Sequence, residues 1–174
     1  MKLSKRIFDI LGKISEWSAK TVMWLVVVLI VIVSYDVLMR YIFNAPTNWQ
    51  FVLSYMLFAT SVALGWAYVH YLGGNVRVDI LYAKFPIRTR LIIDTLFTLI
   101  FFFPSFSLLS FVFIRDAWYA YSIAEKVTFH GTWYPITWPY KTAIALGFCL
   151  LFLQGIANFL KDVISLAKGG EKPW

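Results

Sequence analysis

Four long stretches of the chain carry almost no charge, and each is long enough to cross a lipid bilayer. A helix needs about 20 predominantly apolar residues to span the hydrocarbon core. The chain is 60% hydrophobic and only 14% charged, whereas a soluble domain usually holds about 25% charged residues. We therefore predict an all-α integral membrane protein with a four-helix transmembrane domain at residues 21–164, its spans lying at about 21–39, 49–71, 92–114 and 141–161.

The first 20 residues follow a different pattern. Ile7, Ile10, Ile14 and Trp17 recur at spacings of three and four, and charged residues fill the positions between them. This pattern is typical of an amphipathic helix that lies along a membrane surface. We expect residues 1–20 to form such an interfacial helix on the membrane lipids. No small-residue cleavage site follows it, so we expect it to be retained. Residues 165–174 are expected to form a short cytoplasmic tail.

The positions of the basic residues predict the orientation of the chain. Most of its 16 Lys and Arg residues fall in the N-terminal segment, in the loop between the second and third spans, or after the fourth span. Cytoplasmic segments of membrane proteins carry such an excess. Both ends are therefore predicted to be cytoplasmic. The net charge of +7 is explained by this bias, so no nucleic-acid partner is expected.

The longest connection is predicted at residues 115–140, between the third and fourth spans. It is dense in Trp and Tyr, which gather at membrane interfaces and at protein contacts. Trp133 and Trp138 are candidates for docking a soluble partner or for sealing the outer edge of the protein.

Pro104 lies in the middle of the third predicted span. A proline inside a helix removes a backbone hydrogen bond and usually kinks the helix. We expect a kink there, with Ser105 and Ser107 helping to satisfy the carbonyl groups that Pro104 leaves free.

Few ionisable or strongly polar side chains fall within the spans. Asp36 and Arg40 stand one helical turn apart in the order that favours an ion pair. The pair is interpreted either as a salt bridge at the outer boundary or as a ligand for an ion or substrate. Asp94 is expected in the first turn of the third helix, where the helix dipole favours an acid. Gln154 lies deep in the fourth span and is expected to bond to another helix.

Catalytic and cofactor-binding patterns are missing from the sequence. The two histidines, His70 and His130, are predicted on opposite sides of the membrane, so they cannot ligate one haem. Cys149 is the single cysteine, which excludes an internal disulfide and a thiolate metal site. We expect no cofactor, no metal site and no enzyme activity. Because no inverted repeat or midplane polar cluster marks a solo transporter, we expect the chain to work with a partner.

Several short motifs resemble one family. Arg40 begins an RYIFN segment that Trp49 follows, Asn75 begins NVRVDILY, which contains Arg77 and Asp79, and Lys141 ends a segment rich in proline and aromatic residues. With Gln154 in LQGIA, their order and spacing resemble the small, DctQ-like membrane subunit of tripartite ATP-independent periplasmic (TRAP) transporters. The sequence departs from the family pattern at Gln50–Val52, where an acid is common, and at Asn75, where His is common.

The resemblance implies a partnership. Such a subunit packs beside a large multi-span permease subunit, which moves an organic acid together with sodium. A periplasmic substrate-binding protein delivers that acid, and no ATP is used. The chain would brace the large subunit in the inner (cytoplasmic) membrane of a bacterium or archaeon. The Arg77–Asp79 motif would form a hinge or pair with lipid headgroups. Two alternatives stay open: the membrane anchor of a redox enzyme, and a small self-associating exporter.

Overall fold

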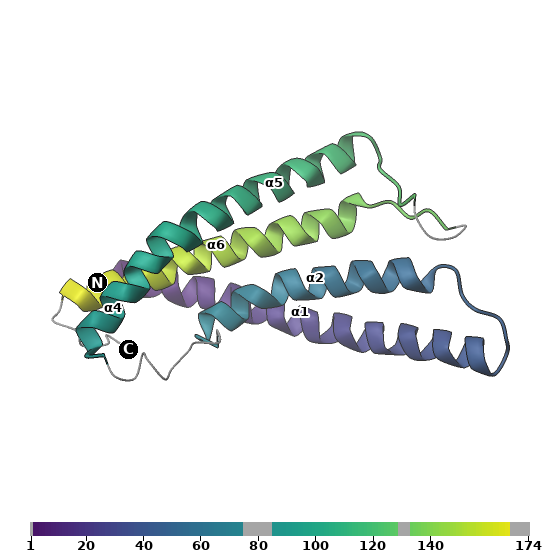
Figure 1. Ribbon diagram of the computed structural model, residues 1–174, viewed down its shortest axis with the longest axis horizontal. Coiled ribbons are helices and arrows are strands. Elements are labelled where there is room, and N and C mark those ends of the chain that lie inside the picture. The colour runs from purple at the N-terminus through teal and green to yellow at the C-terminus, as the bar shows by residue number, and fades with distance from the viewer. Residues whose placement is uncertain (1, 75–84, 129–132, 168–174) are drawn as a thin grey trace.

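The computed structural model describes residues 2–74, 85–128 and 133–167, with side chains from residue 9 onward. These residues form helices and no named strand (Figure 1). The elements are α1 (Lys2–Tyr41), α2 (Gln50–Tyr71), α4 (Ile87–Phe97), the short π-helix η1 (Thr98–Phe102), α5 (Phe103–Ser122) and α6 (Trp138–Ala167). Four helical stretches are long and apolar enough to cross a membrane: Asp9–Tyr41, Gln50–Tyr71, Ile87–Ser122 and Trp138–Ala167. The predicted all-α fold with four potential spans is therefore confirmed.

The helices form two antiparallel hairpins, α1 with α2 and α5 with α6 (Figure 1). Both hairpins begin and end at the same end of the molecule, and they diverge toward the other end. We call the diverging end the outer end, following the predicted orientation. The two middle helices, α2 and α6, also pack against each other, so the order across the molecule is α1, α2, α6, α5.

Glycine allows α2 and α6 to approach closely. A Cβ added at Gly147 of α6 would lie 2.5 Å from the carbonyl oxygen of Ala63 in α2. Further inward, Gly155 faces the ring of Phe102 at the end of η1. Small residues are typical of membrane helix contacts, because apolar side chains gain little from leaving lipid and close packing supplies the attraction.

The chain changes direction between α4 and α5, next to Pro104 (Figure 1). The widened turn η1 ends just before Phe103, and such a turn accommodates a residue that cannot donate its own hydrogen bond. Ser107 donates to the carbonyl of Pro104 itself, at 3.1 Å. That carbonyl lies after the break, so the expectation that Ser107 serves the freed carbonyls is wrong.

Three helix boundaries differ from those expected. The helix α1 continues without a break from Lys2, so residues 1–20 are not separated from the first span. The helix α5 continues to Ser122, so the outer connection begins at Ile123 rather than at residue 115. Asp94 lies past the middle of α4 and not in its first turn.

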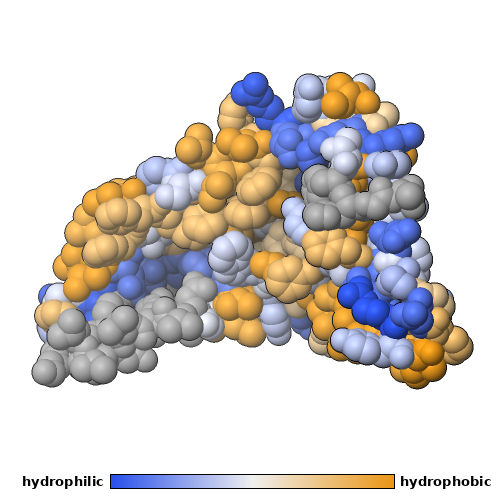
Figure 2. All heavy atoms as spheres, turned by 45° about the vertical axis from the view of Figure 1, so that its right-hand side comes forward, coloured by the Kyte–Doolittle hydropathy of each residue, from blue (hydrophilic) through white to orange (hydrophobic). Residues whose placement is uncertain are grey.

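Most apolar side chains of the two flanking helices face outward. In the most apolar 18-residue stretch of each potential span, only 6% is buried in α1 and in α4–α5, against 28% in α2 and 33% in α6. Figure 2 shows large continuous apolar areas on the visible face, with hydrophilic atoms gathered where the hairpin ends come forward. Exposed apolar area on this scale requires lipid or another apolar subunit around it.

Candidate functional site

The outer end of α6 carries an ion-pair cluster centred on Lys141. Its ammonium nitrogen lies 2.6 Å from a carboxylate oxygen of Glu125 and 3.1 Å from one of Asp116. Asp116 belongs to α5 and Glu125 to the connection that follows it, so the cluster ties three segments together. The Lys141 side chain is only 15% exposed, which strengthens its charge-assisted hydrogen bonds.

The outer connection folds back on itself beside this cluster. The hydroxyl of Thr137 donates to Glu125 at 3.0 Å, and the amide of Val127 donates to the carbonyl of Pro135 at 3.1 Å. The buried side chain of Val127 then packs with Val52 near the start of α2. The loop therefore links the two hairpins at the outer end.

The pKa of Glu125 is held below its usual range, mainly by the hydrogen bond from Lys141 and further by the hydroxyl of Thr137. Burial acts in the opposite direction. Because the folded pKa is depressed, the stabilisation from Glu125 is full above the ordinary glutamate pKa of about 4.3 and is lost as pH falls through the folded value.

We therefore expect acid to loosen the outer loop. In the wild-type protein, protease cleavage between α5 and α6 should rise as pH is lowered from 7 toward 3, measured with a protease active across that range. In Glu125→Gln, cleavage should already be raised at pH 7 and should change less with pH. The same pH response in both proteins would contradict this role.

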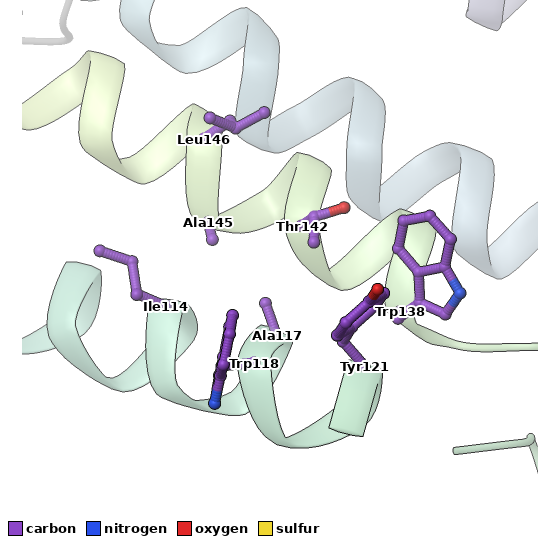
Figure 3. A pocket seen from close by; sticks show the side chains of 8 residues that line it. All are labelled: Ile114, Ala117, Trp118, Tyr121, Trp138, Thr142, Ala145 and Leu146. Atoms are coloured by element: carbon purple, nitrogen blue, oxygen red, sulfur yellow. The ribbon is translucent and has the colours of Figure 1, made fainter. Parts of the chain in front are cut away.

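An apolar groove lies between α5 and α6 (Figure 3), and its lining residues flank Asp116 and Lys141 along the two helices. It has a volume of about 420 Å³. Trp118 and Tyr121 line it from α5, and Trp138 lines it from the start of α6. The rings of Tyr121 and Trp138 meet edge to face, with centroids 5.7 Å apart. Its remaining lining residues are Ile114, Ala117, Thr142, Ala145 and Leu146.

The two tryptophans singled out in the sequence lie in different parts of the outer end. Trp138 belongs to the groove, whereas Trp133 lies in the outer connection and does not line it. Both side chains are partly open, at 38% for Trp133 and 37% for Trp138.

Asp36 anchors the outer turn between α1 and α2. It accepts a hydrogen bond from Arg40 at 2.9 Å and another from the amide of Thr47 at 3.1 Å, and it also accepts one from the Thr47 hydroxyl. The start of α2 is fixed next to this turn, where Trp49 stacks on Tyr35 with ring centroids 6.1 Å apart. The geometry supports the salt-bridge interpretation, extended by the bonds to Thr47.

Replacing Asp36 by Asn should weaken this turn, because the amide cannot pair with the charge of Arg40 and accepts fewer hydrogen bonds. We expect faster proteolysis at residues 42–48 and a lower thermal midpoint in detergent, with normal membrane insertion. Thr47→Ser keeps a hydroxyl and serves as the matched control. If both variants are cut at the wild-type rate, the anchoring role of Asp36 is wrong.

Among the residues that the structure describes, the buried amide of Gln154 bonds along its own helix and not, as expected, across to another. Its nitrogen donates to Asn158 one turn along α6, at 3.4 Å. Asn158 in turn donates to the backbone carbonyl of His70 in α2, at 3.0 Å. Gln154 is 1% exposed and positions Asn158, which makes the cross-helix contact.

The structure brings together only some of the candidate site residues that were predicted from the sequence. Lys141 and Trp138 share the outer end of α6, and Asp36, Arg40 and Trp49 share the α1–α2 turn. Asn75, Arg77 and Asp79 lie outside the described residues. The sequence interpretation missed Asp116, Glu125, Thr137 and Asn158.

One feature of the sequence could have indicated the two acids that were missed, Asp116 and Glu125. A lysine at the start of a predicted span needs a counter-charge, and acids precede it in the adjoining connection. In the part of the chain that the structure describes, no group of three or more His, Cys, Asp or Glu side chains is placed to hold a metal ion.

A comparison with protein families places this geometry in context. The family model described as the DctQ component of tripartite ATP-independent periplasmic transporters matches residues 29–164. The match covers the second and third potential spans in full, most of the fourth, and residues 29–41 of the first, together with the outer ion-pair cluster. The comparison with curated proteins gave no match. The chain therefore belongs to the DctQ family, the small permease component of TRAP transporters.

Proposed function

We propose that the chain braces the large permease subunit of a TRAP transporter in the inner membrane. The large subunit would carry an organic acid together with sodium, and a periplasmic binding protein would deliver that acid. The main observation in support is the outward display of apolar side chains by α1 and α5, which flank a narrow α2–α6 core. A helix layer with two open apolar faces suits a scaffold that packs against a larger subunit.

The described polar groups fit a bracing role. The Lys141 cluster, the Asp36 turn and the Asn158 contact each join segments of this chain at the ends or between helices. Each group is largely occupied by partners within the chain, which favours rigidity. Transport chemistry would then belong to the large subunit.

Co-purification tests this proposal. An affinity tag on the small subunit should recover the large subunit from mild detergent, in a fixed ratio that survives size exclusion. A tagged four-span protein from an unrelated transporter, expressed at the same level, is the control. If the large subunit is recovered equally with both, the bracing role is wrong.

The outer tryptophans are proposed to help dock the periplasmic binding protein. Large aromatic side chains often dominate protein interfaces, and truncating one commonly costs enough affinity for about a tenfold loss. In reconstituted vesicles, Trp133→Ala with Trp138→Ala should raise the binding-protein concentration needed for half-maximal uptake about tenfold. Phe111→Ala, which changes an exposed aromatic residue within α5, is the control. Unchanged concentration dependence would remove this docking role.

A further inference from the structure

The inner half of α1 presents three charged side chains and one tryptophan to the outside of the molecule. Lys13, Glu16, Trp17 and Lys20 recur at spacings of three and four, so they share one helix face. We call these four residues the charged stripe. Lys20 and Glu16 form an ion pair at 2.9 Å while their side chains remain 65% and 50% exposed, and Trp17 is 73% exposed.

Contacts with α2 show where the charged stripe lies between the inner and outer ends of the molecule. Ser18 donates across to the carbonyl of Leu64 at 3.2 Å. One and a half turns earlier, Gly12 lies directly against the ring of Tyr71. The charged stripe therefore runs beside the inner half of α2, and Lys20 lies near the middle of that helix.

The other helices are uncharged at the level of Lys20, whereas Lys13 lies near Tyr71, whose ring centroid is 5.8 Å from the ammonium nitrogen of Lys161 in α6. Ala63, the neighbour of Leu64, lies against Gly147 of α6, and next to Gly147 the ring of Phe148 packs on Phe113 of α5 at 4.5 Å. Along α6, Lys141 is about 9 Å outward of Gly147 and Lys161 is about 21 Å inward. The end of the stripe at Lys20 thus lies level with the uncharged runs of the three other potential spans.

Lipid is an unsuitable cover for such a stripe. A charged side chain within the hydrocarbon costs several kcal/mol, and snorkelling relieves this cost only near the membrane surface. Since α1 is one unbroken helix packed on α2, the stripe cannot turn away to lie along the membrane surface. A protein partner with oxygen acceptors would remove the cost.

We infer that the charged stripe of α1 is the surface on which the large permease subunit docks. Two lysines and one glutamate give the stripe a net charge of +1, so the partner surface would offer a carboxylate or backbone carbonyl groups to Lys13 and Lys20. Trp17 would supply an apolar anchor between them. This inference rests on the proposed bracing function and adds the contact surface to it.

Site-directed spin labelling tests the inference in bilayers. Cysteines are placed singly at Trp17 and Lys20 in a Cys149→Ser background, and the Trp17 variant keeps every charge of the stripe. Phe111→Cys, at an exposed apolar position on α5, is the matched control. Collision with oxygen and with a water-soluble nickel chelate is measured with and without the large subunit.

The large subunit should reduce the collision rate of labels 17 and 20 with both reagents at least fivefold, and should leave label 111 within twofold. If the subunits co-purify but labels 17 and 20 stay accessible, or if label 111 alone is protected, this surface is wrong while the bracing function stands. If the subunits do not co-purify even without labels, the bracing function itself fails.

Discussion

Replacing Gly147 by Ala should force α2 and α6 apart and give one of the two largest losses of stability among single substitutions. The new methyl group would lie 2.5 Å from the backbone oxygen of Ala63 and 3.0 Å from its Cβ. Backbone cannot rotate away as a side chain can. Overpacking of this kind typically costs about 1–3 kcal/mol.

Gly65→Ala provides a matched control in the neighbouring helix. At Gly65 the nearest atom to an added Cβ is a methyl carbon of Val22 at 3.8 Å, an ordinary contact. Alanine also favours helix over glycine by about 1 kcal/mol. Thermal unfolding followed by size exclusion in detergent should show Gly147→Ala clearly below wild type and Gly65→Ala at or above it. Equal midpoints for the two variants would contradict the close α2–α6 packing.

Replacing Lys141 by Ala should give the other large effect. Asp116 and Glu125 would lose their shared cation and face each other as partly buried like charges. Because the acids are 45% and 32% exposed, solvent limits the penalty, and we expect about 1–2 kcal/mol. Loosening of the outer loop should appear as faster proteolysis between α5 and α6.

If Lys141→Ala destabilises the protein by leaving two acids unpaired, removing their charges should restore stability. Adding Asp116→Asn and Glu125→Gln to Lys141→Ala should recover part of the lost stability, because the uncompensated charges are removed. Lys126→Ala is the control, since Lys126 contributes backbone pairing with Ile136 and has an exposed side chain. A triple variant less stable than Lys141→Ala would show that the cluster does not act through charge.

The length of the uncharged runs was sufficient to predict the four long apolar helices. The second span was expected at residues 49–71, and a helix is observed at Gln50–Tyr71, because an uninterrupted apolar run of this length favours a single helix. Helix ends were harder to predict, since tertiary pairing overrides local pattern. Arg115 and Asp116 suggested a loop, yet α5 continues past them to Ser122, and Asp116 is paired with Lys141 across the hairpin.

Long-range partners of polar residues could not be predicted from sequence spacing. Gln154 was chosen because it is the most prominent polar residue deep in its span, but the cross-helix bond comes from Asn158. The rotation of α6 against α2 decides which of two residues one turn apart reaches the neighbouring backbone. That rotation depends on the contact at Gly147, which the sequence alone does not reveal.

Reconstituted uptake tests the central claim most directly. Vesicles are prepared with the small subunit alone, with the large subunit alone, and with both, each with the substrate-loaded binding protein and a sodium gradient. We predict substrate accumulation with both subunits, strongly reduced accumulation with the large subunit alone, and none with the small subunit alone. Solute movement by the small subunit alone would contradict this claim.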